Sequence, residues 1–196
     1  MDNTAGGWIQ THSGRVFYPG ALQSDDICIE DVAHHLSLTC RFAGAVQEFY
    51  SVAQHAIHVS QVCELIDQAS ALWGLLHDAS EAYLGDVTTP LKHAPWMAGY
   101  REHEMALQAA IYGRFGLTGP PPASVRMADR RMLVTEMRDL LPGPARWVRF
   151  NVEPMSFTVL PWPPPIAEAR FLARFDTLMA GRVRSAGEAH QRAPVP

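Results

Sequence analysis

Apolar residues recur every three to four positions along most of the chain, which is the spacing of one face of an α-helix. Val32, Leu36 and Cys40 begin this pattern and predict a first helix over residues 31–43. The same period predicts further helices that begin at residue 51 and cover residues 70–83, 94–115, 123–141 and 166–182. We therefore expect an all-α fold, a helical bundle formed by one domain over residues 1–196.

Two segments depart from the helical period. Residues 1–28 are rich in Gly, Thr and aromatic residues, and they predict an irregular N-terminal arm with a short β-ribbon. Residues 142–165 contain repeated prolines and alternating Val and Phe, which favours a small β-hairpin near the C-terminus. The helical core is thus expected over about 29–141, and the Pro-rich segment with the final helix over 142–184.

The most apolar predicted helix, residues 70–83, contains three ionisable residues close together. Glu81 follows His77 by four positions and Asp78 by three, so a continuous helix would direct all three side chains toward one site. Burying such groups is costly unless they are paired or bound to a metal. Imidazole and carboxylate are ligands of divalent transition metals. The spacing favours a metal centre over a simple buried ion pair of His77 and Asp78.

Two neighbouring residues do not complete a metal's ligand set, so other helices must contribute. His55 and His58 lie one turn apart after a capping-box pattern, Ser51-Val-Ala-Gln, and either one is a candidate ligand or an ordinary core histidine. Asp129 lies in the apolar run VRMADRRML. Its alternative is a solvated acid that pairs with a neighbouring arginine, which means Arg126, Arg130 or Arg131.

Composition and charge exclude several classes of function. The chain has 47% hydrophobic and 18% charged residues, a net charge of −4, and a calculated pI of about 6.1. This charge disfavours a polynucleotide substrate. We expect a cytoplasmic protein without a membrane segment, because the sequence lacks a signal-peptide pattern and a long apolar span.

Two other groups of residues predict no site. Cys28, Cys40 and Cys63 are odd in number and lack C-x-x-C spacing, which is typical of reduced, buried thiols. His34 and His35 are adjacent and would point about 100° apart on a helix, so they are not expected to share an ion.

The order of these groups resembles that of a known family. The segments YSVAQHAIHVS, GLLHDASEAYLGDVTTPLK and RMADR are similar to the HD-domain metal-dependent phosphohydrolases over about residues 30–140. The most specific part is the His-Asp doublet followed by an acid four positions after the histidine and by G-D-x-x-T-P. Within the family, the chain resembles the branch of small 5′-deoxynucleotidases and phage deoxynucleoside triphosphohydrolases, such as dATP triphosphohydrolases.

The resemblance implies a role for each matching residue. One divalent ion, whether Zn, Mn, Co, Fe or Mg, would be held by His55, His77, Asp78 and Asp129. A second Mg²⁺ would accompany the substrate phosphates. Catalysis is assigned to Glu81, as the acid/base group, together with Asp78. The implied substrate contacts are Arg41, Phe42, Asp86, Lys92 and Arg126.

The expected function is hydrolysis of a small nucleotide at its phosphate, either as a 5′-deoxynucleotidase or as a deoxynucleoside triphosphohydrolase. A divalent ion lowers the pKa of a bound water from about 15.7 toward about 7 and neutralises phosphoryl charge. The expected partners are a small-molecule nucleotide and other copies of the chain, in a dimer or higher homo-oligomer. The alternatives are a cyclic nucleotide phosphodiesterase and a non-catalytic nucleotide-sensing module.

Overall fold

The computed structural model describes residues 7–19, 24–144 and 146–191, and most of these residues are helical. The all-α fold class is therefore confirmed. The hairpin consists of β1 (Ile9–Gln10) and β2 (Val16–Phe17). The α-helices are α1 (Ile29–Leu38), α2 (Val52–Ile66), α3 (Ala71–Leu76), α4 (Glu81–Leu84), α5 (Thr89–Lys92), α6 (Ala98–Arg114), α7 (Ala123–Leu140) and α8 (Pro164–Gln191).

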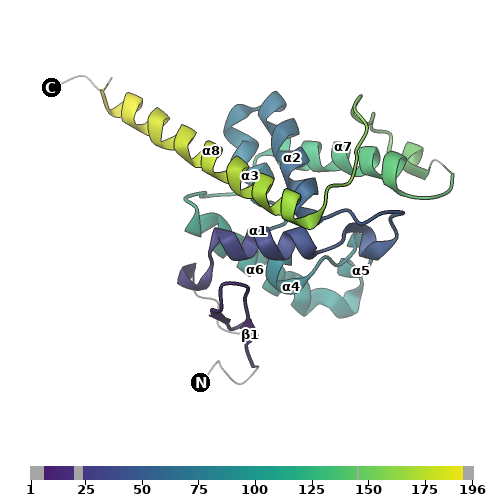
Figure 1. Cartoon of the computed structure of the whole chain (residues 1–196), viewed down its shortest axis with the longest axis horizontal. Coiled ribbons are helices and arrows are strands. Elements are labelled where there is room, and N and C mark those ends of the chain that lie inside the picture. Colours follow the sequence, from purple (N-terminus) through teal and green to yellow (C-terminus); the bar gives the residue numbers. More distant parts are fainter. Residues whose placement is uncertain (1–6, 20–23, 145, 192–196) are drawn as a thin grey trace.

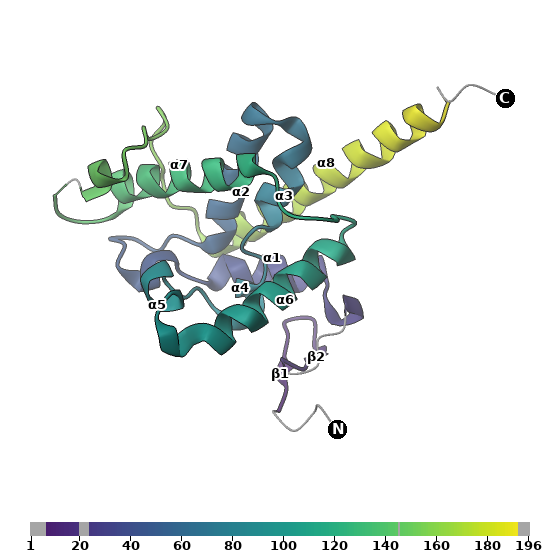
Figure 2. The ribbon, with the colours of Figure 1, turned by 180° about the vertical axis from the view of Figure 1, so that it is seen from behind.

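Helix α2 lies at the centre of the bundle. It packs against α1, α3, α7 and α8, and its residues Val52, Ala53 and Ala56 are fully buried. Helix α8 crosses α1, α2 and α3 and then extends beyond the rest of the chain (Figure 1). From behind, α6 covers the opposite side of the molecule, below α7 (Figure 2). The packing brings parts of α2, α3 and α7 together in the interior.

Gly74 permits the close approach of α2 and α3. A Cβ atom at this position would lie 2.7 Å from Cys63 Sγ and 3.1 Å from the Ser60 Cα on α2. Real Cβ atoms do not tolerate the shorter distance without movement of a neighbour. The two helices that carry His55 and lead to His77 can therefore lie this close only because residue 74 has no side chain.

The N-terminal arm forms the expected β-ribbon and packs on the core. Ile9 pairs with Phe17 and Gln10 with Val16 in an antiparallel register. Phe17 is 1% exposed and stacks on Tyr83, with 4.4 Å between the ring centroids. The hairpin turn is held by the fully buried Asp31, which accepts hydrogen bonds from the Ser13 backbone N–H and hydroxyl.

The C-terminal hairpin is a correction to the sequence analysis. The described part of residues 142–165 contains a 3₁₀ helix, Arg146–Phe150, and irregular chain, with no strand. Arg138 and Asp139 of α7 hold this segment by hydrogen bonds to the Met155 and Phe157 carbonyls and from the Val159 N–H. Bonds to α7 thus take the place of strand pairing. Helix α8 also runs further than expected, to Gln191.

The predicted helices over residues 31–43 and 70–83 also differ from the observed ones in their bounds. The first helix ends at Leu38 rather than residue 43, and residues Arg41–Gly44 form a separate 3₁₀ turn in which Phe42 has a left-handed φ of 56°. The predicted helix over 70–83 is divided into α3 and α4 by a turn at residues 77–80. His77, Asp78 and Glu81 therefore do not share one continuous helix.

The start of α2 confirms half of the predicted capping box. The Ser51 hydroxyl accepts a hydrogen bond from the Gln54 N–H at 3.1 Å. The Gln54 side chain does not bond back to the Ser51 N–H but instead binds the segment before α8, donating to the Leu160 carbonyl and accepting from the Trp162 N–H.

Among the described residues, no helix combines the length and the apolar character needed to cross a membrane.

Candidate metal centre

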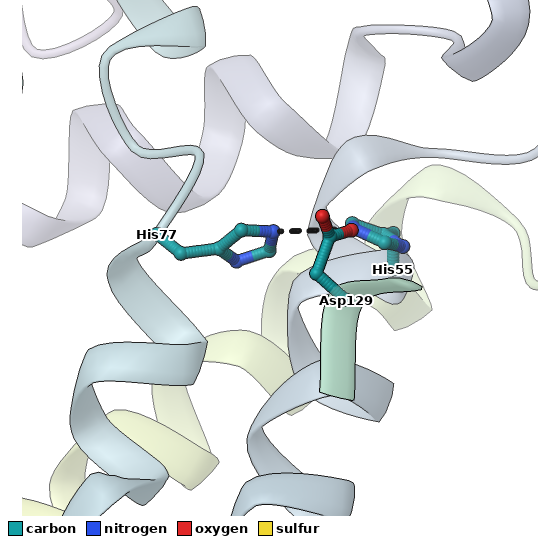
Figure 3. Close-up of side chains that lie close together, drawn as sticks. All are labelled: His55, His77 and Asp129. Carbon is teal, nitrogen blue, oxygen red and sulfur yellow. Dashed lines mark hydrogen bonds and ion pairs between the residues drawn. The ribbon is translucent and has the colours of Figure 1, made fainter. Parts of the chain in front are cut away.

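Three side chains from different parts of the fold meet in the interior. His55 comes from α2, His77 follows the end of α3, and Asp129 comes from α7 (Figure 3). The two Nε2 atoms are 3.3 Å apart, and Asp129 Oδ1 lies 3.3 Å from His55 Nε2 and 3.8 Å from His77 Nε2. These three residues form a group that could hold a metal ion.

Asp78 borders the same group. Its Oδ2 atom lies 3.1 Å from His77 Nε2 and 3.6 Å from His55 Nε2. Asp78 is thus adjacent to the group of His55, His77 and Asp129, the residues that could hold a metal ion. Their burial is uneven, because the side chain of His55 is fully buried whereas that of Asp129 is 42% exposed. The centre is open to solvent on the carboxylate side.

The donor atoms fit a divalent ion in both spacing and chemistry. Ligands about 2.1 Å from a tetrahedral ion are about 3.4 Å apart, close to the observed separations. The Nδ1 atom of His77 lies 2.8 Å from the Gly74 carbonyl and that of His55 lies 2.6 Å from a Glu136 carboxylate oxygen. Because both partners are acceptors, each Nδ1 carries the proton, and in the neutral ring Nε2 presents a lone pair. Two facing lone pairs and two carboxylates repel one another, and a bound cation would stabilise this arrangement.

The ionisable side chains at the centre shift one another's pKa values. Burial lowers the pKa of the His77 imidazole, but Asp78 and Asp129 outweigh burial and hold this pKa well above its usual value. Burial raises the pKa of Asp129, yet hydrogen bonds from the two histidines hold it well below its usual value. Burial likewise raises the pKa of Asp78, but the neighbouring His77 outweighs burial and holds this pKa below its usual value. The carboxylates therefore remain anionic at the centre.

Glu81 lies beside the centre at the start of α4. Its side chain is 4% exposed, and its Oε1 atom accepts a hydrogen bond from Lys92 Nζ at 3.0 Å. The Oε2 atom is buried and has no hydrogen-bond partner among the described residues. Burial raises the pKa of Glu81, and Asp78 and Asp86 raise it further against the opposing effect of Lys92. A buried carboxyl group whose pKa is raised in this way is a candidate for proton transfer.

The two cations nearest the centre are already bound to carboxylates. Lys92 donates to Glu81 and also to Glu104 Oε1 at 2.6 Å. Arg41 Nε lies 3.2 Å from Glu136 Oε2, and Arg41 Nη1 lies 3.5 Å from Asp78 Oδ2. Either side chain would have to release or share a carboxylate in order to contact a phosphate. In this structure, their immediate effect is to hold Glu81 and Asp78 in place.

The other implied substrate contacts surround the centre less closely. Asp86 is half-buried, and burial, the largest effect, raises the pKa of its carboxyl, as does Asp78. The Phe42 ring lies 5.3 Å from the Arg41 guanidinium carbon. Arg126 is exposed on α7, one turn before Asp129. A cavity of about 600 Å³ opens beside His77 and Asp78 and is also lined by Lys92, Glu104 and Tyr112.

Three of the other histidines, His34, His35 and His58, have partners outside the centre. His58 lies 3.3 Å from Gln61 Oε1 and packs near the rings of Phe157 and Trp162. Of the two α2 histidines, the structure therefore places His55 at the centre. His34 Nδ1 bonds Glu168 at 3.0 Å, and His35 bonds the Ala82 carbonyl at 2.8 Å.

Glu136 was not predicted from the sequence, although it is fully buried and contacts His55, Arg41 and Tyr50. A signal was present, because Glu136 follows Asp129 by seven residues and so lies two turns further along the same face of α7. It is an acid within an otherwise apolar stretch of that face. Glu104, the second partner of Lys92, was also missed, and its position on the more polar α6 held no comparable signal.

Comparison with known proteins gives two bacterial relatives. The uncharacterized protein YfdR of Escherichia coli is 41% identical over 174 residues, which cover 87% of this chain and 95% of that protein. An uncharacterized protein of Rhodobacter capsulatus is 32% identical over 170 residues, which cover 79% of this chain and 86% of that protein. No protein-family model matches the chain.

Proposed function

The chain belongs to the family of Escherichia coli YfdR, and we propose that it is a metal-dependent phosphohydrolase that acts on the phosphate of a small nucleotide. The observation that carries this proposal is the meeting of His55, His77 and Asp129 in one group that could hold a metal ion. Asp78 lies beside both histidines, and it acts electrostatically on the buried acid Glu81. The similarity of these segments to the HD-domain phosphohydrolases supports it.

The arrangement supports hydrolysis in two respects. A divalent ion held by these residues would supply an activated water and would offset the charge of a phosphoryl oxygen. The carboxylate side of the centre is open, so a phosphate and a water can approach there, whereas the histidine side is closed. The 600 Å³ cavity beside His77 and Asp78 has the size of a small-molecule site.

Glu81 is the proposed proton-transfer group, through its Oε2 atom. This atom has no partner among the described residues, while Oε1 is held by Lys92. Lys92 thus orients the side chain through Oε1 and leaves Oε2 available for proton transfer. Such a group contributes typically about 10²–10⁴-fold to the rate.

A substrate screen tests the proposal. Protein stripped of metal and reloaded with Mn²⁺, Co²⁺ or Mg²⁺ is incubated with each deoxy- and ribonucleotide as the mono-, di- and triphosphate. We expect metal-dependent release of orthophosphate or tripolyphosphate from at least one of them. Tight nucleotide binding without turnover would instead identify a sensing module, and cleavage of cyclic nucleotides alone would identify a phosphodiesterase.

We expect Asp86 to select deoxyribonucleotides. Gly85, with a φ of 77°, turns the chain after α4, and the half-buried Asp86 follows it within electrostatic reach of Glu81. A carboxylate that accepts the 3′-OH would hold the sugar near the backbone and leave little room for a 2′-OH. Losing a hydrogen bond to a charged group costs about 1.5–3 kcal/mol, so Asp86→Ala should lower kcat/KM for the deoxy substrate about 10- to 150-fold.

The measurement is kcat/KM for paired deoxy- and ribonucleotides in both proteins. In Asp86→Ala, kcat/KM should fall less for the ribonucleotide than for its deoxy counterpart. The ratio of the two kcat/KM values should therefore be smaller than in the wild-type protein. Glu153→Gln, a change of an exposed acid outside the centre, is the control. Equal wild-type values for the two sugars would refute this role of Asp86 while leaving the metal centre unaffected.

A further inference from the structure

Glu136 is a fully buried acid that is hydrogen-bonded to His55 of the candidate metal centre and to two further side chains, Tyr50 and Arg41. Its Oε1 atom accepts from His55 Nδ1 at 2.6 Å and from the Tyr50 hydroxyl at 2.8 Å. Its Oε2 atom accepts from Arg41 Nε at 3.2 Å. Both Glu136 and Tyr50 are 0% exposed. An anion so far from water persists only when every oxygen is bound, and here both are.

We propose that Glu136 is the positioning residue of the metal centre, which fixes the ring orientation and tautomer of His55 so that its Nε2 lone pair points at the ion. The inference rests on the metal site within the proposed function, and it does not depend on which substrate is cleaved. It assigns to α7 a second role, because the same helix supplies both the ligand Asp129 and the residue that orients the ligand His55.

The direction of the bond decides the tautomer. A carboxylate oxygen at 2.6 Å can only accept, so the proton of a neutral His55 ring lies on Nδ1 and the lone pair on Nε2. The Nε2 atom is the one that lies 3.3 Å from both His77 Nε2 and Asp129 Oδ1. Without Glu136, the ring could rotate or exchange its proton between nitrogens, and the ordered lone pair would be lost.

The two histidines are oriented by different kinds of acceptor. His77 uses the neutral carbonyl of Gly74, which lies three residues earlier, within α3. His55 uses an anion supplied by a helix 81 residues further along the chain. A negatively charged acceptor increases the electron density of the imidazole and its strength as a ligand. We therefore expect His55 to be the more strongly supported ligand of the two.

Arg41 extends the same network to a second ligand. Its guanidinium group lies between Glu136 and Asp78, with Nη1 3.5 Å from Asp78 Oδ2. Arg41 is held in the Arg41–Gly44 turn, whose left-handed residues Phe42 and Ala43 reverse the chain there. Glu136 thus balances the charge of a cation that would otherwise be buried against the metal site. Tyr50 donates to the same oxygen as His55 and limits the movement of the carboxylate.

The central test is the metal affinity of Glu136→Gln. The full chain is stripped with a chelator, and the Kd for Zn²⁺ and Mn²⁺ is measured by competition with a metal-binding dye. Loss of such a supporting group typically weakens metal binding about 10- to 100-fold, and we expect a Kd increase in this range. Tyr50→Phe, which leaves the carboxylate in place, should raise the Kd less.

Asp31→Asn is the matched control, because Asp31 is also a fully buried acid but binds Ser13 and Cys28 of the arm and the start of α1. Both substitutions should lower the Tm of the metal-free protein, but only Glu136→Gln should change the Kd. In a His55→Ala background, Glu136→Gln should cause little further change. An unchanged Kd in folded Glu136→Gln, or an equal change in Asp31→Asn, would overturn the proposal.

A measurement on the wild-type protein avoids any problem of folding in the variants. In the Zn²⁺-loaded chain, the ring ¹⁵N signals of His55 should show a proton bonded to Nδ1 and a metal at Nε2. Ligation through Nδ1 would overturn the proposal. Neither readout uses turnover, so metal binding of this kind in a protein that hydrolyses no nucleotide would refute the proposed function but not this inference.

Discussion

Replacing His77 or Asp78 by alanine should abolish phosphohydrolase activity and stoichiometric metal binding together. His77 belongs to the group of three residues that could hold a metal ion, and Asp78 Oδ2 lies 3.1 Å from His77 Nε2. His77→Ala leaves one imidazole with two carboxylates, and Asp78→Ala leaves two imidazoles with one carboxylate, so each variant offers the metal one ligand fewer. The measurements are bound metal by elemental analysis of the purified protein and phosphate release from the best substrate of the screen.

His58→Ala is the matched control for His77→Ala. His58 is a half-buried histidine with its own hydrogen-bond partner and ring contacts, but it lies outside the centre. It should retain both metal and activity. Circular dichroism should show that all three variants remain folded, because the core of α2 and α3 does not depend on the metal ligands. Full metal content and full turnover in either His77→Ala or Asp78→Ala would mean that these residues are a structural ion pair.

Glu81→Gln should lower kcat by about 10²–10⁴-fold while metal and nucleotide still bind. The amide retains the shape of the side chain, and its oxygen can still accept from Lys92, but it can no longer exchange a proton at the second position. The measurements are kcat and KM under saturating metal, with nucleotide affinity determined separately. Turnover at the wild-type rate would show that the proton is handled by another group.

Glu104→Gln separates proton transfer from the positioning of Lys92, because Glu104 is the other carboxylate bound to that lysine. It should reduce kcat far less than Glu81→Gln. A comparison of kcat against pH adds a second test, since the wild-type profile should contain a limb that Glu81→Gln lacks. The raised pKa of Glu81 places this limb above the range of an ordinary glutamate. A fall in rate with rising pH would mark Glu81 as the acid, and a rise would mark it as the base.

Much of the candidate centre could be predicted from local sequence. His77 and Asp78 were conspicuous because ionisable groups in an apolar helical run need partners. Asp129 was detectable for the same reason on α7. These inferences depend only on the cost of burying charge and on helical spacing, both of which act over a few residues. The helical fold class followed from the same short-range periodicity.

Helical periodicity alone left both His55 and His58 as candidate ligands, the family resemblance named His55, and the tertiary structure shows which elements cover each histidine. The two histidines lie one turn apart on α2, so periodicity assigns them to similar faces. The rotation of α2 in the bundle decides between them, because α7 covers the side of His55 while Phe157 and Trp162 cover the side of His58. Both covering segments are remote in sequence.

The break between α3 and α4 could not be predicted from the local sequence for a similar reason. Residues 77–80 include no glycine or proline, so the local pattern predicted a continuous helix. The turn is stabilised from α6, where the Gln108 amide accepts from the Ser80 N–H and donates to the Leu76 carbonyl. Backbone groups that would have bonded within a helix are satisfied instead by a side chain about 30 residues away in sequence.

The sequence by itself determined the helical class, the metal-binding residue types and the segments that carry them, because these depend on periodicity and on the cost of buried charge. Tertiary structure alone decided where Glu81 lies relative to His77 and that Glu136 is joined to His55 across 81 residues. These features depend on how helices rotate and pack against one another. Packing couples side chains that share no local pattern, so it becomes visible only when the chain is folded.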